Sequence, residues 1–170
     1  APVQPGKVSS ILVPTSTEYP DMKIVTGSFV TSNGDMNLIV VGAAVQTNQT
    51  LNPVQQATQD ATNSEKIWLL GDFRAWEGDH LLAYFFLNNT QYLYSGNTTG
   101  VKSSSQPYAI LSVPDLLILG GHFVKDGNQS SGILLIQNTS TSQLIDITGP
   151  LEDENSYVAA LAVNDSVLYF

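Results

Sequence analysis

Short apolar segments alternate with polar turns along most of this sequence. Valine, isoleucine, leucine and aromatic residues fill the segments, and Asn, Asp, Ser and Pro stand between them. Runs of this length and composition are typical of β-strands. We expect strands at 37–41, 81–87, 92–94, 132–136 and 143–147.

No window of helix length carries a convincing helical period of apolar positions. The 55–62 segment comes closest, but it has few apolar residues. We interpret it as a polar loop or one helical turn within a linker-like region, 47–64. The sequence therefore predicts an all-β fold.

One pattern recurs along the chain: a polar turn, an apolar strand, and then Gly-x-Phe. It occurs as 20–29 (PDMKIVTGSF), 64–73 (SEKIWLLGDF) and 114–123 (PDLLILGGHF), and a truncated copy begins at 164 (NDSVLYF). Pro-Asp and Asn-Asp favour tight turns. We expect the glycine to let the chain bulge close to its neighbour, with the phenylalanine packed inward.

The copies lie about 50 residues apart with about four strands in each spacing, which is typical of a kelch-type β-propeller blade. We therefore predict one all-β repeat region over 1–170, made of antiparallel, propeller-blade-like sheets. Its units lie near 20–63, 64–113 and 114–163, with a truncated copy at 164–170. Such a set of blades would form an open arc with exposed edges. A β-sandwich is the alternative architecture.

Charge, cysteine content and the length of the apolar runs exclude several classes of partner and site. The formal net charge is −9, which repels a phosphate backbone and argues against nucleic-acid binding. The sequence has no cysteine, which rules out disulfides, thiolate metal clusters and a cysteine nucleophile. No apolar run reaches the roughly 20 residues of a membrane helix, so we expect no membrane span in this segment.

Asn-x-Ser/Thr sequons are the strongest indication of compartment. Together with the few lysines and a charged fraction of only 12%, they favour an extracellular or cell-surface glycoprotein made in the secretory pathway. The candidate N-glycosylation sites are Asn48, Asn88, Asn97, Asn128, Asn138 and Asn164.

The sequence offers no catalytic or cofactor-binding residues, because nucleophile-elbow, phosphate-loop and dinucleotide-binding patterns are all absent. His122 stands inside the repeated pattern, where we expect a structural or surface role. A metal site stays undecided, because acidic residues cluster without a metal-ligand spacing. These residues are Asp72, Glu77 and Asp79, and separately 152–154. Trp68 is expected in the core, whereas Trp76, in a polar turn, is a candidate for ligand stacking.

The repeated segments resemble those of a known family. Residues 116–123 (LLILGGHF), 144–151 (LIDITGPL) and 157–163 (YVAALAV) resemble the kelch-type repeats in the ectodomain of the fungal cortical cell-polarity marker, or bud-site-selection, family. The resemblance covers 64–170 and, more loosely, 20–45. It implies a non-enzymatic type I membrane glycoprotein of the fungal cell surface, with its membrane helix far downstream, that marks growth or division sites through protein partners.

Three functions are compatible with these observations. The leading hypothesis is a non-enzymatic extracellular module for binding or structural organisation at the cell surface, with proteins or glycans as partners. The second is a carbohydrate-binding or glycoside-active secreted domain that uses Trp76 with nearby carboxylates. The third is a fragment of a larger assembly, an oligomer or a strand-complemented one, completed by strand pairing at 167–170.

Overall fold

The computed structural model of this chain is all-β in the residues that it describes. These residues are 4–31, 34–41, 52–72, 81–96, 98, 100–102, 104–127, 129–137, 144–146 and 155–170. Their strands form antiparallel sheets, and no helix occurs among them. The described residues therefore contain no helix long and apolar enough to cross a membrane. The predicted all-β class is confirmed.

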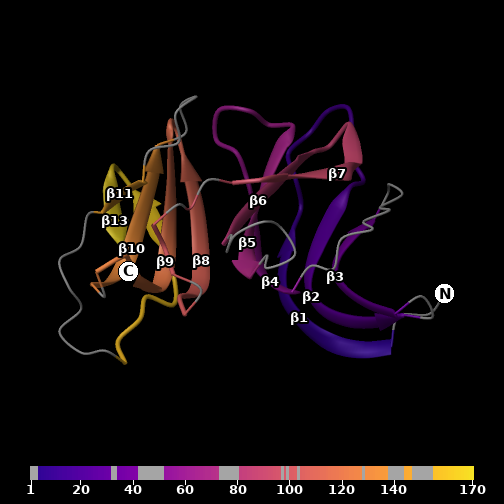
Figure 1. Ribbon diagram of the computed structural model, residues 1–170. Helices are drawn as coiled ribbons and strands as arrows, with labels where there is room; N and C mark the ends of the chain where they lie inside the picture. The colour runs from indigo at the N-terminus through magenta and orange to yellow at the C-terminus, as the bar shows by residue number, and fades with distance from the viewer. Residues whose placement is uncertain are drawn as a thin grey trace.

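Four sheets follow one another along the chain (Figure 1). Sheet 1 comprises β1 (Gln4–Leu12), β2 (Lys23–Thr31) and β3 (Gly34–Val41). Sheet 2 comprises β4 (Asn52–Gln59), β5 (Lys66–Asp72), β6 (Leu82–Phe86) and β7 (Asn89–Ser95). Sheet 3 comprises β8 (Gln106–Val113), β9 (Leu116–Val124), β10 (Ser130–Gln137) and β11 (Leu144–Asp146). The fourth sheet is a hairpin of β12 (Ala162–Asn164) and β13 (Val167–Tyr169).

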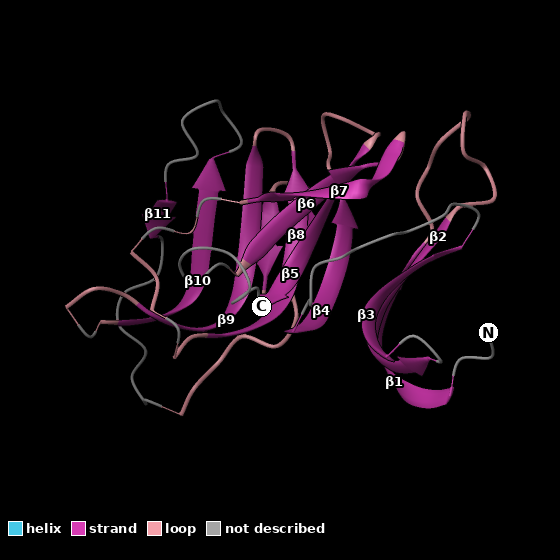
Figure 2. Cartoon of the chain, turned by 45° about the vertical axis from the view of Figure 1, so that its right-hand side comes forward, coloured by secondary structure: helices cyan, strands magenta, loops and turns pink. Residues whose placement is uncertain are grey.

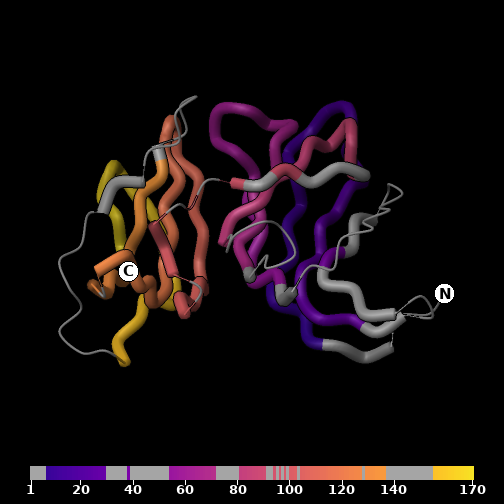
Figure 3. The backbone as a smooth tube through the Cα atoms, viewed as in Figure 1, coloured from indigo at the N-terminus to yellow at the C-terminus, as the bar shows by residue number. Residues whose placement is uncertain are grey.

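Within every sheet, strands adjacent in sequence are adjacent in space, so each sheet is a simple meander. The sheets are stacked beside one another in chain order: β4 contacts β1 and β2 on one side and β8 on the other. Figure 2 gives the same arrangement in a turned view, and Figure 3 traces the chain through it from sheet 1 to the hairpin. The described strands do not close into a ring.

Two apolar cores hold this stack together. The first lies between sheets 1 and 2 and includes Ile24, Leu38 and Phe85. The second lies between sheets 2 and 3 and includes Leu82 and Leu134. Burial of large apolar side chains on this scale is the main source of stability for such a fold.

Strand β5 contributes to both cores. Ile67 and Leu69 belong to the core shared with sheet 1, whereas Trp68 and Leu70 belong to the core shared with sheet 3. Successive side chains of a strand point to opposite faces of the sheet. A strand covered on both faces must therefore be apolar at every position, which explains the unbroken Ile-Trp-Leu-Leu run.

The same β-bulge occurs in the first three sheets. In each of these sheets, one residue of the first strand pairs with the glycine of the Gly-x-Phe pattern on the second strand. The next residue of the first strand has no partner, so this strand carries one extra residue there. The extra residues are Ser9, Gln55 and Tyr108, and the paired glycines are Gly27, Gly71 and Gly121. The sequence repeat thus corresponds to a repeated structural unit, and the bulge expected at the glycine is present.

Close backbone contact explains why glycine is required here. A Cβ atom on Gly27 would lie 2.0 Å from the carbonyl oxygen of Lys7, and one on Gly121 would lie 2.3 Å from that of Gln106. Neither distance is possible for a real side chain. The phenylalanines that follow, Phe29 and Phe123, are buried as expected.

The sheets are offset from the predicted repeat units. Each sequence unit begins just before a second strand, at β2, β5 or β9, whereas the sheets begin one strand earlier, at β1, β4 and β8. Sheets 2 and 3 therefore each combine the last strand of one sequence unit with the first strands of the next, and β1 precedes the first unit.

The interpretation of 55–62 as a loop or helical turn was wrong, and so was that of 47–64 as a linker. Strand β4 occupies much of this region. Its polar residues are satisfied by neighbouring sheets: the Gln56 Oε1 atom accepts a 2.8 Å hydrogen bond from the Ile110 amide of β8. Val54 and Ala57 are buried. Because glutamine side chains in this strand bond to neighbouring backbone groups, the strand lacks the apolar pattern on which the sequence prediction relied.

Candidate binding groove

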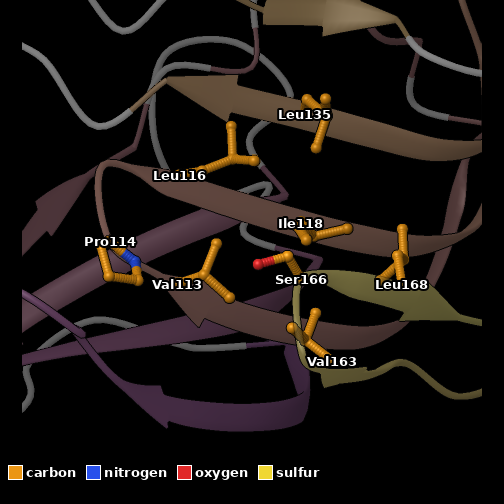
Figure 4. Close-up of a pocket in the computed structure, with 8 residues that line it drawn as sticks. All are labelled: Val113, Pro114, Leu116, Ile118, Leu135, Val163, Ser166 and Leu168. Atoms are coloured by element: carbon orange, nitrogen blue, oxygen red, sulfur yellow. The ribbon is translucent and has the colours of Figure 1, made fainter.

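An apolar groove lies between sheet 3 and the hairpin β12–β13 (Figure 4). Its volume is about 440 Å³. The end of β8, the β8–β9 turn, β9 and β10 form one wall, and the hairpin forms the other. The lining residues are Val113, Pro114, Leu116, Ile118, Leu135, Val163, Ser166 and Leu168.

Strand alternation determines which side chains reach the groove. Leu117 and Leu119 of β9 are buried in the core with sheet 2, so Leu116 and Ile118 lie on the opposite face. Leu135 of β10 pairs with Ile118 and shares that face. Sheet 3 therefore carries apolar side chains on both faces, but only its sheet 2 face is fully covered.

The hairpin on the other wall is closed by a tight turn. Asn164 pairs with Val167, and the two residues between them, Asp165 and Ser166, have φ angles of 47° and 66°. Positive φ at both central positions defines a type I′ turn, whose twist matches that of paired strands. The turn places Ser166 in the groove, where its hydroxyl is the one polar side-chain group among the lining residues.

The segment before the hairpin is attached to the end of sheet 3. The Val158 amide donates a 3.0 Å hydrogen bond to the Gly121 carbonyl, and the His122 Nδ1 atom lies 2.9 Å from the Ser156 carbonyl oxygen. The rings of Tyr108 and Tyr157 are in contact, with centroids 4.9 Å apart. His122 thus makes a structural contact, in agreement with its expected role.

A buried carboxylate, Asp60, organises the turn between β4 and β5. It is 4% exposed and accepts hydrogen bonds from the Thr62 amide and hydroxyl, the Asn63 amide and, at 2.7 Å, the Trp68 Nε1–H group. Burial by itself would raise the pKa of Asp60. The hydrogen bonds stabilise the charged form more strongly and lower this pKa to about 2.

Trp68, which donates to Asp60, is also part of an aromatic cluster on sheet 2. Trp68 is 5% exposed, so its predicted core position is confirmed, and its ring contacts Tyr84 at 4.9 Å between centroids. Tyr84 stacks on Tyr94, and the Lys66 Nζ atom lies 4.0 Å from the Trp68 ring centroid and 4.2 Å from that of Tyr84. These are structural contacts that cover the lysine charge with aromatic faces.

Two of the six sequons lie within the described part of the chain. Asn88 is exposed in the turn between β6 and β7, and Asn164 is exposed at the end of β12. Asn48, Asn97, Asn128 and Asn138 lie outside the described residues, as does Trp76.

The acidic residues considered for a metal give no site in the described part of the chain. Asp72 ends β5, while Glu77, Asp79 and 152–154 lie outside the described residues. Among the described residues, no three His, Asp or Glu side chains converge to hold a metal ion.

Sequence reasoning identified the 167–170 edge but missed the groove beside it. The signal was present in the apolar residues of the truncated copy, 164–170. Their partners on sheet 3 could be identified only once the stacking of the sheets was known.

Comparison with known protein families, with curated proteins and with solved structures finds no match to this chain.

Proposed function

We propose that this chain is a non-enzymatic extracellular module that binds protein partners and organises them at the cell surface. The observation that carries the proposal is the apolar groove between sheet 3 and the hairpin. Its eight lining residues supply hydrocarbon and a single hydroxyl, which suits burial of apolar groups of a partner.

The repeated sheets support a propeller-like scaffold for this module. Stacked meanders of three or four described strands, with one bulge in the same place in the first three of them, are what an arc of kelch-type blades requires. An open arc leaves a sheet face uncovered at each end. Ile11, on the outer face of β1, is 65% exposed and fits this expectation.

Glycosylation and surface location form the second half of the proposal. Asn88 and Asn164 are exposed, so neither would have to leave a core to carry a glycan. The resemblance of the repeats to those of fungal cortical polarity markers favours the surface of a fungal cell and a role in marking growth sites.

The experiment is expression of the tagged chain in a eukaryotic secretory host. We expect an intact mass that falls on enzymatic glycan removal, with a smaller loss for Asn88→Gln than for the unaltered chain. The purified glycosylated protein should be retained on intact cells, and Leu135→Asp in the groove should reduce that retention. Turnover of a sugar or ester panel that disappears when one carboxylate is changed would overturn the proposal, as would an unglycosylated chain kept inside the cell.

A further inference from the structure

The hairpin of β6 and β7 is closed by one of the sequons (Figure 1). Phe86, the last residue of β6, pairs with Asn89, and Leu87 and Asn88 form the turn between them. Asn88 is exposed, and Thr90, which completes the sequon, follows Asn89 on β7. A glycan on Asn88 would therefore be attached two residues away from the Phe86 ring.

The turn that carries Asn88 is fixed to the rest of the sheet. The Leu87 side chain is 2% exposed and belongs to the core shared with sheet 1. The Leu87 amide also donates a 2.8 Å hydrogen bond to the Glu65 carbonyl. Buried contacts of this kind restrict the motion of a turn, so the first sugar on Asn88 would stay close to the sheet.

The Phe86 ring is only half-buried. Phe85 and Leu87 pack into the core with sheet 1, so Phe86 lies on the opposite face of the sheet, together with Tyr84. The ring centroids of Tyr84 and Tyr94 lie 5.9 and 5.7 Å from that of Phe86. Because these two tyrosines stack on each other, both lie on the same side of Phe86.

The residues that pair with Phe86 leave its ring half-exposed. Lys66 of β5 pairs with Phe86, but its Nζ atom lies over the rings of Trp68 and Tyr84. Asn89, the partner on β7, has a short side chain and is itself exposed. An aromatic surface thus remains accessible beside the attachment point of a glycan.

The first sugar of an N-linked glycan, N-acetylglucosamine, has C–H groups on the faces of its ring. These groups are weakly positive, whereas the face of an aromatic ring is negative, so the two attract each other and exclude water. A sugar already attached to the chain makes this contact at high effective concentration. It does not lose the translational freedom that a free ligand loses on binding.

The residue before the turn distinguishes Asn88 from the other five sequons. Only Asn88 has an aromatic residue two positions before the asparagine. At Asn164, which is exposed and also lies beside a two-residue turn, this position holds Ala162. Asn164 is therefore a matched control for any general effect of a glycan.

We propose that the first N-acetylglucosamine of a glycan on Asn88 stacks on the Phe86 ring and stabilises the β6–β7 hairpin. This inference rests on the proposed function, which includes glycosylation of the chain. It deepens that function by giving one glycan a structural role in sheet 2.

The test uses the full chain secreted from a eukaryotic host, with glycan occupancy of each asparagine measured by mass spectrometry. Urea denaturation gives the equilibrium constant of folding. Asn88→Gln should lower this constant by about fivefold, equivalent to about 1 kcal/mol. Asn164→Gln should lower it by less than about twofold.

Two enzymatic treatments separate the first sugar from the rest of the glycan. Trimming to a single N-acetylglucosamine should leave the folding constant of the unaltered chain unchanged within about twofold. After complete removal of all glycans, the unaltered chain and Asn88→Gln should unfold alike, which excludes an effect of the side chain itself.

A double-mutant cycle with Phe86→Leu tests the ring, because leucine keeps an apolar side chain but has no aromatic face. In the Phe86→Leu background, Asn88→Gln should lower the folding constant by less than about twofold. An equal loss in both backgrounds would overturn the inference. So would a loss of stability on trimming to one sugar, which needs no substitution in the chain.

Failure of this inference differs from failure of the proposed function. A chain that carries a glycan on Asn88 but gains no stability from it remains a glycoprotein, and only the stacking on Phe86 is refuted. Glycans found at other sequons but absent from Asn88 would refute the stacking in the same way. A secretory-host chain without any glycan would refute both.

Discussion

The Gln56 side chain and the Ile110 backbone join two sheets: the Gln56 Oε1 atom accepts a 2.8 Å hydrogen bond from the Ile110 amide. Sheets 1 and 2 are joined in the same way, since the Ser10 hydroxyl accepts a 3.2 Å hydrogen bond from the Ala57 amide. Ser10 and Gln56, the two acceptors, each directly follow the bulge residue of their own sheet. Ala57 and Ile110, the two donors, each lie two residues after the bulge residue of theirs.

This repeated bond ends at sheet 3. The residue after its bulge is Ala109, whose methyl side chain cannot accept a hydrogen bond. The hairpin is attached instead through Val158 and His122 near the end of the sheet. Polar side chains that follow the bulge thus join the stack at its two internal interfaces, whereas at the groove the segment before the hairpin makes the hydrogen bonds.

Gln56→Leu should destabilise the fold although it keeps side-chain size. The Ile110 amide would lose its acceptor, and a buried donor without a partner costs about 1–3 kcal/mol. Urea denaturation measures this change in the free energy of unfolding. Gln129→Leu, at an exposed position, is the control and should change it by less than about 0.5 kcal/mol. Equal effects would refute a role for the inter-sheet bond.

Stability should fall in acid because of Asp60. Its pKa is about 2 in the folded protein and about 3.9 in an unfolded chain, so folding favours the ionised form. The stabilisation is complete above about pH 5 and is lost as the pH falls through about 2; it amounts to about 2 kcal/mol.

The measurement is the free energy of unfolding of the unaltered chain and of Asp60→Asn between pH 6 and pH 2. The advantage of the unaltered chain should shrink by about 2 kcal/mol across this range. A constant difference between the chain and Asp60→Asn would contradict the low pKa.

Gly121→Ala should be strongly destabilising for a steric reason. The added methyl would lie 2.3 Å from the Gln106 carbonyl oxygen, so strands β8 and β9 would have to separate. We expect a loss of at least about 2 kcal/mol by thermal denaturation.

Gly127→Ala distinguishes this steric effect from backbone strain. Gly127 has a φ of 89°, and no atom beyond its two chain neighbours lies within 4 Å of the position that an added methyl group would take. Only conformational strain of about 1 kcal/mol therefore applies. If the two substitutions cost the same, close approach of the strands is not the reason for glycine at 121.

Asp115→Gly should stabilise the turn between β8 and β9. Asp115 follows Pro114 and has a φ of 61°, which is the third position of a type II turn, where glycine is preferred. Removing the strain should raise the free energy of unfolding by about 0.5 kcal/mol after the added flexibility of the unfolded chain is subtracted. Asp115→Val, a β-branched residue at positive φ, should lower it; a stabilising valine would exclude this turn type.

The sequence predicted the strands with uninterrupted apolar runs, such as β6, β9 and β10, because a strand that is buried is made of apolar residues. Strands β1 and β4 were not predicted from the sequence. Their serines and glutamines are satisfied by the next sheet, for example Ser9, whose hydroxyl donates to the Val54 carbonyl. A residue whose partner lies in another sheet looks like a loop residue when only its neighbours in sequence are considered.

The sequence by itself determined the all-β class, the recurrence of Gly-x-Phe and the burial of Trp68, Phe29 and Phe123, because these depend on local pattern and on hydrophobicity. Only the tertiary structure decided which strands form a sheet, which backbone amide meets Gln56, and that sheet 3 and the hairpin enclose a groove. Those features arise where residues distant in the chain meet. The free energy of such contacts depends on distance and orientation in space, which no local pattern encodes.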